Sequence, residues 1–255
     1  MSTRDADGEP QGRDALERDG RLRVGLLKCG SIRRDLVGDF GDYPELFAEL
    51  MSDHDIELVT FDVEHDEFPD SPTECDGWLV SGSASSVYEP LPWIGRTRDL
   101  LAEIVTAGVP LVAVCFGHQL LAQALGGEVQ KSERGWGVGV HHYDVIAPLT
   151  GWPDDAPQPT QISLIASHQD QVVRVPASVT ILAASHHCPV AAFSFGRRVL
   201  AIQAHPEFGP ALARGLIQGR RDVIGSERAE AALATLDQPI DQSAIAHWFA
   251  AILAT

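Results

Sequence analysis

Short apolar runs alternate with amphipathic segments through the first half of the chain. Each apolar run is long enough for one buried strand, and each segment between them repeats its apolar residues with helical spacing. The pattern predicts strands at 23–30, 56–63, 76–80 and 109–115, and helices at 44–52 and 93–106. An alternation of this kind predicts a parallel sheet that is covered on both faces by helices.

The pattern changes after Gly127, where strand-like runs follow one another with few helices between them. These runs lie at 137–147, 160–166, 180–185, 190–195 and 198–204, and helical spacing returns at 210–224 and 243–253. We therefore expect an α/β fold with one doubly wound mixed sheet, a mostly parallel core, antiparallel additions and helices on both faces. Residues 21–255 are expected to form a single domain, and the polar residues 1–20 a disordered tail.

The excess of acidic residues excludes some classes of binding partner. Lys and Arg number 19 against 36 Asp and Glu, which gives a formal charge of −17. The segment from Asp35 to Gly95 holds sixteen acidic residues and no Lys or Arg. Such a charge repels nucleic acid and anionic lipid surfaces, so neither is expected as a partner. No apolar stretch of membrane-spanning length and no signal peptide occurs, so we expect a soluble, cytoplasmic protein.

One of the four cysteines stands at the point where a strand passes into a helix. The sequence "VAVCFGHQLLAQALGG" places Cys115 between an apolar run and an amphipathic segment, with Ala113 two residues before it and Gly117 two after. A tight strand-to-helix turn exposes a nucleophile, supplies backbone N–H groups for an oxyanion and favours a thiolate. The alternative is a buried, unreactive thiol.

A partner for this thiol occurs in "AIQAHPEFG". His205 ends an apolar run, and Glu207 follows it by two residues, so both side chains point the same way in an extended segment. The carboxylate is then placed to orient the imidazole, as a thiol nucleophile requires of its base. The alternative is that these residues only cap the helix that follows.

Taken together, these segments resemble the class I glutamine amidotransferase family from Arg23 to about Arg221. The matching motifs, in order, are "SGS" with "SVY" after the third strand, "CFGHQLLAQALGG", "GWGVG", "SHQDQV" and "HPEF". The chain is most similar to the free-standing amidotransferase-like proteins, which include the plant γ-glutamyl peptidases. It shares "GDYPELF" and "SHQDQV" type motifs with them, and "SVYE" and "HPEF" are also similar to the amidotransferase domain of GMP synthetases.

The resemblance implies a role for each matched residue. Cys115 is the expected nucleophile, His205 the general base and acid, and Glu207 the group that orients His205. The backbone N–H groups of Gly82 and Phe116 are expected to form the oxyanion hole. The residues expected to line the pocket for the glutamyl group are Gln119, Trp136, Ser167, His168 and Gln169.

The chemistry implied is cleavage of the γ-amide of glutamine or of a γ-glutamyl compound through a thioester, with no cofactor or metal. The loop reads "SGSAS" where many amidotransferases have "SGGP", so the specificity is expected to differ from that of a plain glutaminase. The absence of a G-x-x-x-x-G-K-[ST] motif favours an ammonia donor to a separate synthetase subunit. A γ-glutamyl hydrolase or transferase that acts alone is the alternative, and a non-catalytic binding protein on the same fold is a third.

Overall fold

In the computed structural model, which describes residues 20–154 and 156–255, one large sheet runs through the protein. The polar tail expected over residues 1–20 lies outside these residues, apart from Gly20. The strands are β1 Leu22–Lys28, β2 Ile56–Asp62, β3 Gly77–Val80, β4 Leu111–Val114, β5 Glu128–Lys131, β6 Gly137–Val145, β7 Gln161–His168, β8 Asp170–Arg174, β9 Thr180–Ala184, β10 Ala192–Phe195 and β11 Val199–Ile202. The helices are α1 Arg34–Phe40, α2 Tyr43–Leu50, α3 Pro92–Ala107, α4 Phe116–Ala124, α5 Pro210–Gly219, α6 Arg221–Ile224, α7 Ser226–Leu233 and α8 Gln242–Leu253, with a 3-10 turn at Val63–His65.

The large sheet has nine strands in the order β2-β1-β3-β4-β11-β10-β9-β6-β7. The strands from β2 to β11 pair in parallel, and those from β11 to β7 pair antiparallel. This arrangement confirms the mixed sheet with a parallel core and antiparallel additions that the apolar pattern predicts. The remaining strands, β5 and β8, form a separate antiparallel pair.

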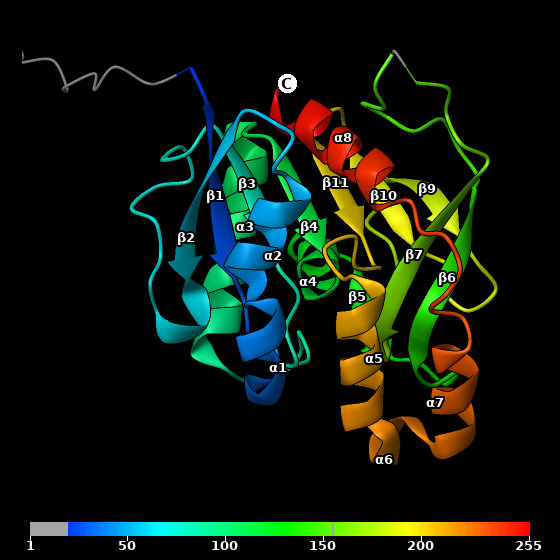
Figure 1. Cartoon of the computed structure of the whole chain (residues 1–255). Coiled ribbons are helices and arrows are strands. Elements are labelled where there is room, and N and C mark those ends of the chain that lie inside the picture. The colour runs from blue at the N-terminus through cyan, green and yellow to red at the C-terminus, as the bar shows by residue number, and fades with distance from the viewer. Residues whose placement is uncertain (1–19, 155) are drawn as a thin grey trace, which may run out of the picture.

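Two apolar cores lie on opposite faces of this sheet, because side chains alternate along each strand. In β4, Val112 and Val114 join the core that contains Phe47 of α2 and Trp248 of α8. Leu111 and Ala113 join the other core, which is completed by α3 and α4. Figure 1 shows α2, α5 and α8 on the near side of the sheet, with α3 and α4 on its far side. Helices therefore cover both faces, as expected.

Four elements depart from the expected pattern. The elements α1, α7, β5 and β8 fall in segments for which the pattern predicts no helix or strand. The apolar segment 210–224 is divided at Arg220, whose backbone leaves the helical conformation at φ −114° and ψ 13°. No helix in residues 20–154 and 156–255 combines the length and apolar character needed to cross a bilayer.

The carboxyl ends of β4 and β11 determine where the chemistry gathers. These strands are adjacent and parallel, with Val114 opposite Ile202 in the register. The residues that follow them, Cys115 and Gln203, therefore emerge side by side at one edge of the sheet. Open parallel sheets place their reactive groups at this edge.

Candidate active site

Cys115 occupies the turn between β4 and α4 in a strained backbone conformation. Its φ is 51° and its ψ −101°, a region that side-chain-bearing residues rarely adopt. The turn is close-packed: a Cβ on Gly117 would lie 2.8 Å from Val80 Cβ, and the Gly117 N–H donates to the Ser81 oxygen at 3.2 Å. The glycine two residues after the cysteine is thus required by the approach of α4 to β3.

His205 and Glu207 form a buried pair beside this cysteine. The Nδ1–H of His205 donates to Glu207 Oε1 at 2.6 Å, and both side chains are almost inaccessible to solvent. Burial lowers the pKa of His205, but the charges of Cys115 and Glu207 and the hydrogen bonds to both outweigh it and raise the pKa to about 10. His205 and Glu207 therefore form a hydrogen-bonded pair, and the imidazole lies close enough to Cys115 for the charges of the two groups to interact.

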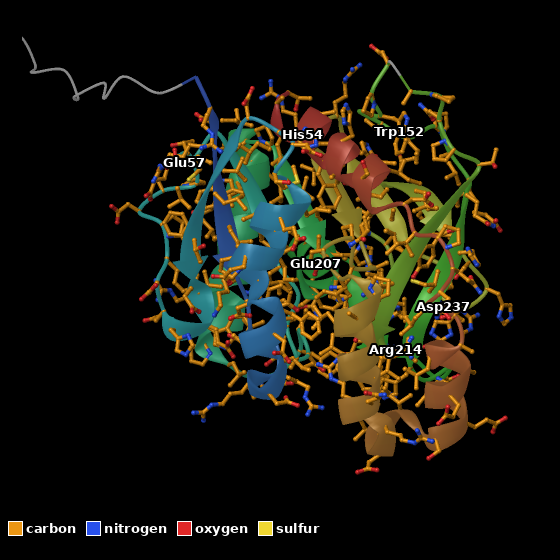
Figure 2. All side chains as sticks on the ribbon, viewed as in Figure 1. His54, Glu57, Trp152, Glu207, Arg214 and Asp237 are labelled. Atoms are coloured by element: carbon orange, nitrogen blue, oxygen red, sulfur yellow. The ribbon has the colours of Figure 1, made fainter. Side chains whose placement is uncertain are left out.

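The segment that carries this pair is held from three directions. The His205 N–H donates to the Ile165 oxygen of β7 at 2.8 Å. The ring of Phe208 stacks on the His205 imidazole with centroids 4.0 Å apart and an interplanar angle of 2°. Gln242, the first residue of α8, donates from Nε2 to the oxygens of Pro206 and Phe208 at 2.6 and 3.1 Å. Figure 2 shows Glu207 in the interior of the molecule, whereas Glu57 and Asp237 lie at its periphery.

Gly82 and Phe116, the two residues expected to form the oxyanion hole, each carry a backbone amide that is not used within the described part of the fold. Neither N–H donates to an acceptor within residues 20–154 and 156–255, and Phe116 opens α4, where the helix itself offers no acceptor. A Cβ on Gly82 would lie 2.5 Å from Tyr43 Oη and 2.9 Å from His205 Cε1. Glycine is therefore the residue that lets this loop approach the imidazole.

An open cleft of about 270 Å³ extends from the cysteine. Its walls include seven of the residues expected at the site: Cys115, Phe116, Gln119, Trp136, Ser167, His168 and Gln169. His205 lines a smaller adjoining cavity of about 20 Å³. Glu207 lines a third cavity, of about 480 Å³. Gly82 lines none of these cavities, but its neighbour Ser83 lines the first two.

Two hydrogen bonds fix the side chain of Gln119 inside this cleft. Its Nε2 donates to the Asp170 oxygen at 2.8 Å and to Gln203 Oε1 at 3.1 Å, and its side chain is buried. Gln203 in turn donates from Nε2 to Cys115 Sγ at 3.7 Å. Gln119 thus lies within a chain of hydrogen bonds that reaches the sulfur.

Three residues of the site are absent from the sequence-based prediction: Gln203, Tyr43 and Arg220. Gln203 precedes His205 by two residues, so the alternation that pairs His205 with Glu207 also places Gln203 on the same side. Tyr43 lies in the "GDYPELF" motif, and its ring stacks with Phe208 at 6.3 Å. Arg220 carries no local signal, because its place in the cleft depends on where α5 ends.

One group of side chains in the described ranges has the spacing of a metal site. Ligand atoms of Asp62, Glu64 and His65 lie within 4.8 Å of one another at the carboxyl end of β2. The Lys28 ammonium already pairs with Asp62 there at 2.8 Å, so the group includes a cation of the protein itself. Because β1 and β3 separate β2 from β4, this group stands apart from Cys115.

Comparison with known proteins places the chain in a family. Residues 39–217 match the family model described as "Glutamine amidotransferase class-I". γ-Glutamyl peptidase 3 of Arabidopsis thaliana is 27% identical over 198 residues, which cover 76% of this chain and 79% of the relative. One subunit of the glutamine-hydrolysing GMP synthase of Halobacterium salinarum is 34% identical over 179 residues, which cover 68% of this chain and 87% of the relative.

The fold agrees with solved structures of the same family. The crystal structure of a glutamine amidotransferase from Thermotoga maritima has a TM-score of 0.69 at 18% identity, and covers 92% of this chain and 96% of the other. The family model spans more than half of the chain, and the residues that carry the motifs meet at one edge of the sheet. The chain therefore belongs to the class I glutamine amidotransferase family.

Proposed function

We propose that this protein is a cysteine hydrolase that cleaves γ-glutamyl amides. The observation that carries the proposal is the buried, hydrogen-bonded pair of His205 and Glu207 after β11, next to Cys115 at the end of the adjacent strand β4. Family membership supports it, since the relatives named above are a γ-glutamyl peptidase and part of a glutamine-hydrolysing synthase. Both kinds of substrate contain the same bond, an amide of the γ-carboxyl group of a glutamyl residue.

The proposed reaction proceeds through a thioester. His205 takes the thiol proton, and Cys115 Sγ attacks the δ-carbonyl carbon while the Gly82 and Phe116 N–H groups stabilise the oxyanion. The C–N bond then breaks, and His205 delivers its proton to the departing nitrogen. Water, deprotonated by His205, attacks the thioester and releases glutamate, which returns Cys115 to its thiol. His205 thus passes one proton from the thiol to the departing amine and a second from water back to the sulfur. Glu207 keeps the imidazole oriented throughout.

A second candidate function is ammonia supply to a separate synthetase. It is favoured by the match to the GMP synthase component of Halobacterium salinarum over most of that protein's length. The hydrolytic chemistry is the same in both cases, and only the departing amine and the need for a partner differ. A purified protein that cleaves γ-glutamyl peptides alone would favour the first candidate, and one that needs a cell extract to cleave glutamine would favour the second.

The proposal predicts that Cys115→Ala abolishes hydrolysis. Glutamate release from glutamine and from a panel of γ-glutamyl peptides should fall by about 10⁴-fold or more, because the nucleophile is lost. Mass spectrometry of the acid-quenched wild-type protein should show a γ-glutamyl adduct on Cys115. Cys188→Ala is the matched control, since Cys188 is equally buried and burial raises its pKa to about 12. Unchanged hydrolysis by Cys115→Ala would show that the proposal is wrong.

A further inference from the structure

Arg220 lies where the two cavities beside the catalytic group meet. It is partly buried, at the junction of α5 and α6, and lines both the 270 Å³ cleft with Cys115 and the small cavity with His205. Ser83, which follows the Gly82 amide, also lines both cavities. Arg220 therefore borders both the cleft that contains the sulfur and the cavity that contains the imidazole.

This guanidinium has no counter-charge in the part of the chain that the structure describes. Its one hydrogen bond runs from NH1 to the Ser167 hydroxyl at 3.0 Å, and it lies 6.0 Å from the Trp136 ring. Arg33, which also lines the small cavity, is instead neutralised by Asp35 at 2.9 Å. In a chain of formal charge −17, a partly buried cation without a carboxylate partner is unusual.

The other charges of the cleft leave Arg220 free to bind an anion. Asp170, a carboxylate in the cleft wall, accepts a hydrogen bond from the Tyr88 hydroxyl at 3.0 Å. Lys131 also lines the cleft, but it is exposed and does not line the cavity that contains His205. Of these two cations, only Arg220 combines partial burial with a position next to the imidazole.

The proposed reaction determines which part of a substrate lies next to Arg220. His205 gives its proton to the departing nitrogen, so the amine must lie on the imidazole's side of the sulfur. A guanidinium bordering the same side meets groups attached to that amine. A carboxylate is the group that its forked N–H donors match best.

We propose that Arg220 forms a subsite for a carboxylate on the departing amine. This inference rests on the proposed function and names its substrate class: γ-glutamyl peptides whose amine part is an amino acid or short peptide with a free carboxylate. Arg220 is thus a specificity residue, and glutamine, whose departing group is ammonia, leaves this subsite unused.

The test compares two substrates that differ only in this charge, γ-glutamylglycine and γ-glutamylglycinamide. Wild-type protein should cleave γ-glutamylglycine with a kcat/KM higher by about tenfold or more, the usual effect of a charge-assisted hydrogen bond. Arg220→Gln should abolish this preference, and Arg220→Lys should restore part of it. Cleavage of γ-glutamylglycinamide by Arg220→Gln should fall less than cleavage of γ-glutamylglycine, and thermal unfolding reports whether the variant is folded.

Lys131→Gln is the matched control, because it removes a cation from the same cleft but not from the imidazole's side. It should keep the wild-type preference. A wild-type protein with no preference, an Arg220→Gln variant that loses both substrates equally, or a Lys131→Gln variant that loses the preference instead would each overturn the inference. If the wild-type protein cleaves neither peptide nor glutamine, the proposed function itself fails.

Discussion

At the residue scale, Gly82 illustrates how the site depends on the absence of a side chain. The loop after β3 passes so close to Tyr43 and His205 that a single methyl group has no room. In the proposed reaction, the missing side chain and the unpaired N–H together let this loop approach the substrate carbonyl.

We therefore predict that Gly82→Ala lowers kcat by about 10²-fold or more, comparable to the loss of one oxyanion donor. The added Cβ would displace either Tyr43 or the imidazole. Steady-state kinetics with the best γ-glutamyl substrate checks this prediction, and thermal unfolding shows whether the fold persists. Gly38→Ala is the control, because an added Cβ there meets nothing within 4 Å. A fully active Gly82→Ala would show that the site does not require the missing side chain at this position.

The sequence predicts site residues whose role depends on local backbone geometry. It does not predict site residues that only tertiary packing brings together. The strand-to-helix turn identifies Cys115, and the two-residue alternation identifies His205 with Glu207. Arg220 lies on neither pattern. It reaches Ser167 only because α5 ends at that point and packs next to β7, which no spacing along the chain encodes.

At the scale of elements, α8 supports the catalytic group although none of its residues lines the cleft at Cys115. Its Gln242 holds the backbone oxygens on both sides of Glu207. The helix is anchored by its apolar face, where Ile245, Trp248 and Phe249 are fully buried. Since Gln242 is fixed to α8, the position of Glu207 follows the packing of the helix.

Gln242→Ala is expected to lower kcat several-fold with little change in KM, because the Glu207 segment loses two hydrogen bonds that position it. The free energy of unfolding should fall by about 1–2 kcal/mol. Urea unfolding and steady-state kinetics measure the two effects. Gln238→Ala is a suitable control, since Gln238 bonds only the exposed His142. Equal kinetics for the two variants would show that α8 does not position the carboxylate.

Elements with a strong apolar pattern are predictable, and those without one are not. The strands of the large sheet and the helices α2, α3, α5 and α8 carry clear apolar faces. By contrast, α7 buries only Ala229 and Ala232, and α1 buries no side chain, so neither gives a recognisable apolar stripe. The strands β5 and β8 are short, pair only with each other, and add only Val129 and Val172 to the apolar core.

At the scale of the whole molecule, buried histidines make the fold sensitive to acid. Burial lowers the pKa of His118, on the inner face of α4, to about 3, against an ordinary value of 6.5. Burial, reinforced by His187, lowers the pKa of His141 in β6 to about 4. Both rings are neutral in the folded protein and would acquire a proton on unfolding in mild acid.

Between pH 6.5 and about 3, His118 is protonated in the unfolded chain but neutral in the folded chain. The free energy of unfolding therefore falls as the pH falls through this range. His118 alone contributes about 1.4 kcal/mol per pH unit across this window. His118→Phe should therefore flatten the acid limb of the unfolding free energy measured by urea denaturation. His186→Gln, which removes an exposed histidine, should not. Parallel acid limbs for wild type and His118→Phe would refute this account.

The register between β4 and β11 has a consequence for how such proteins diversify. Cys115 and His205 follow adjacent parallel strands, although a long stretch of chain, from α4 to β10, separates these strands in sequence. That stretch adds β6, β7, β9 and β10 to the same sheet before the chain returns beside β4. Insertions or exchanges within it can therefore reshape the part of the cleft wall that contains Trp136 and Ser167 while Cys115 and His205 keep their spacing, so substrate range can evolve without a change in that spacing.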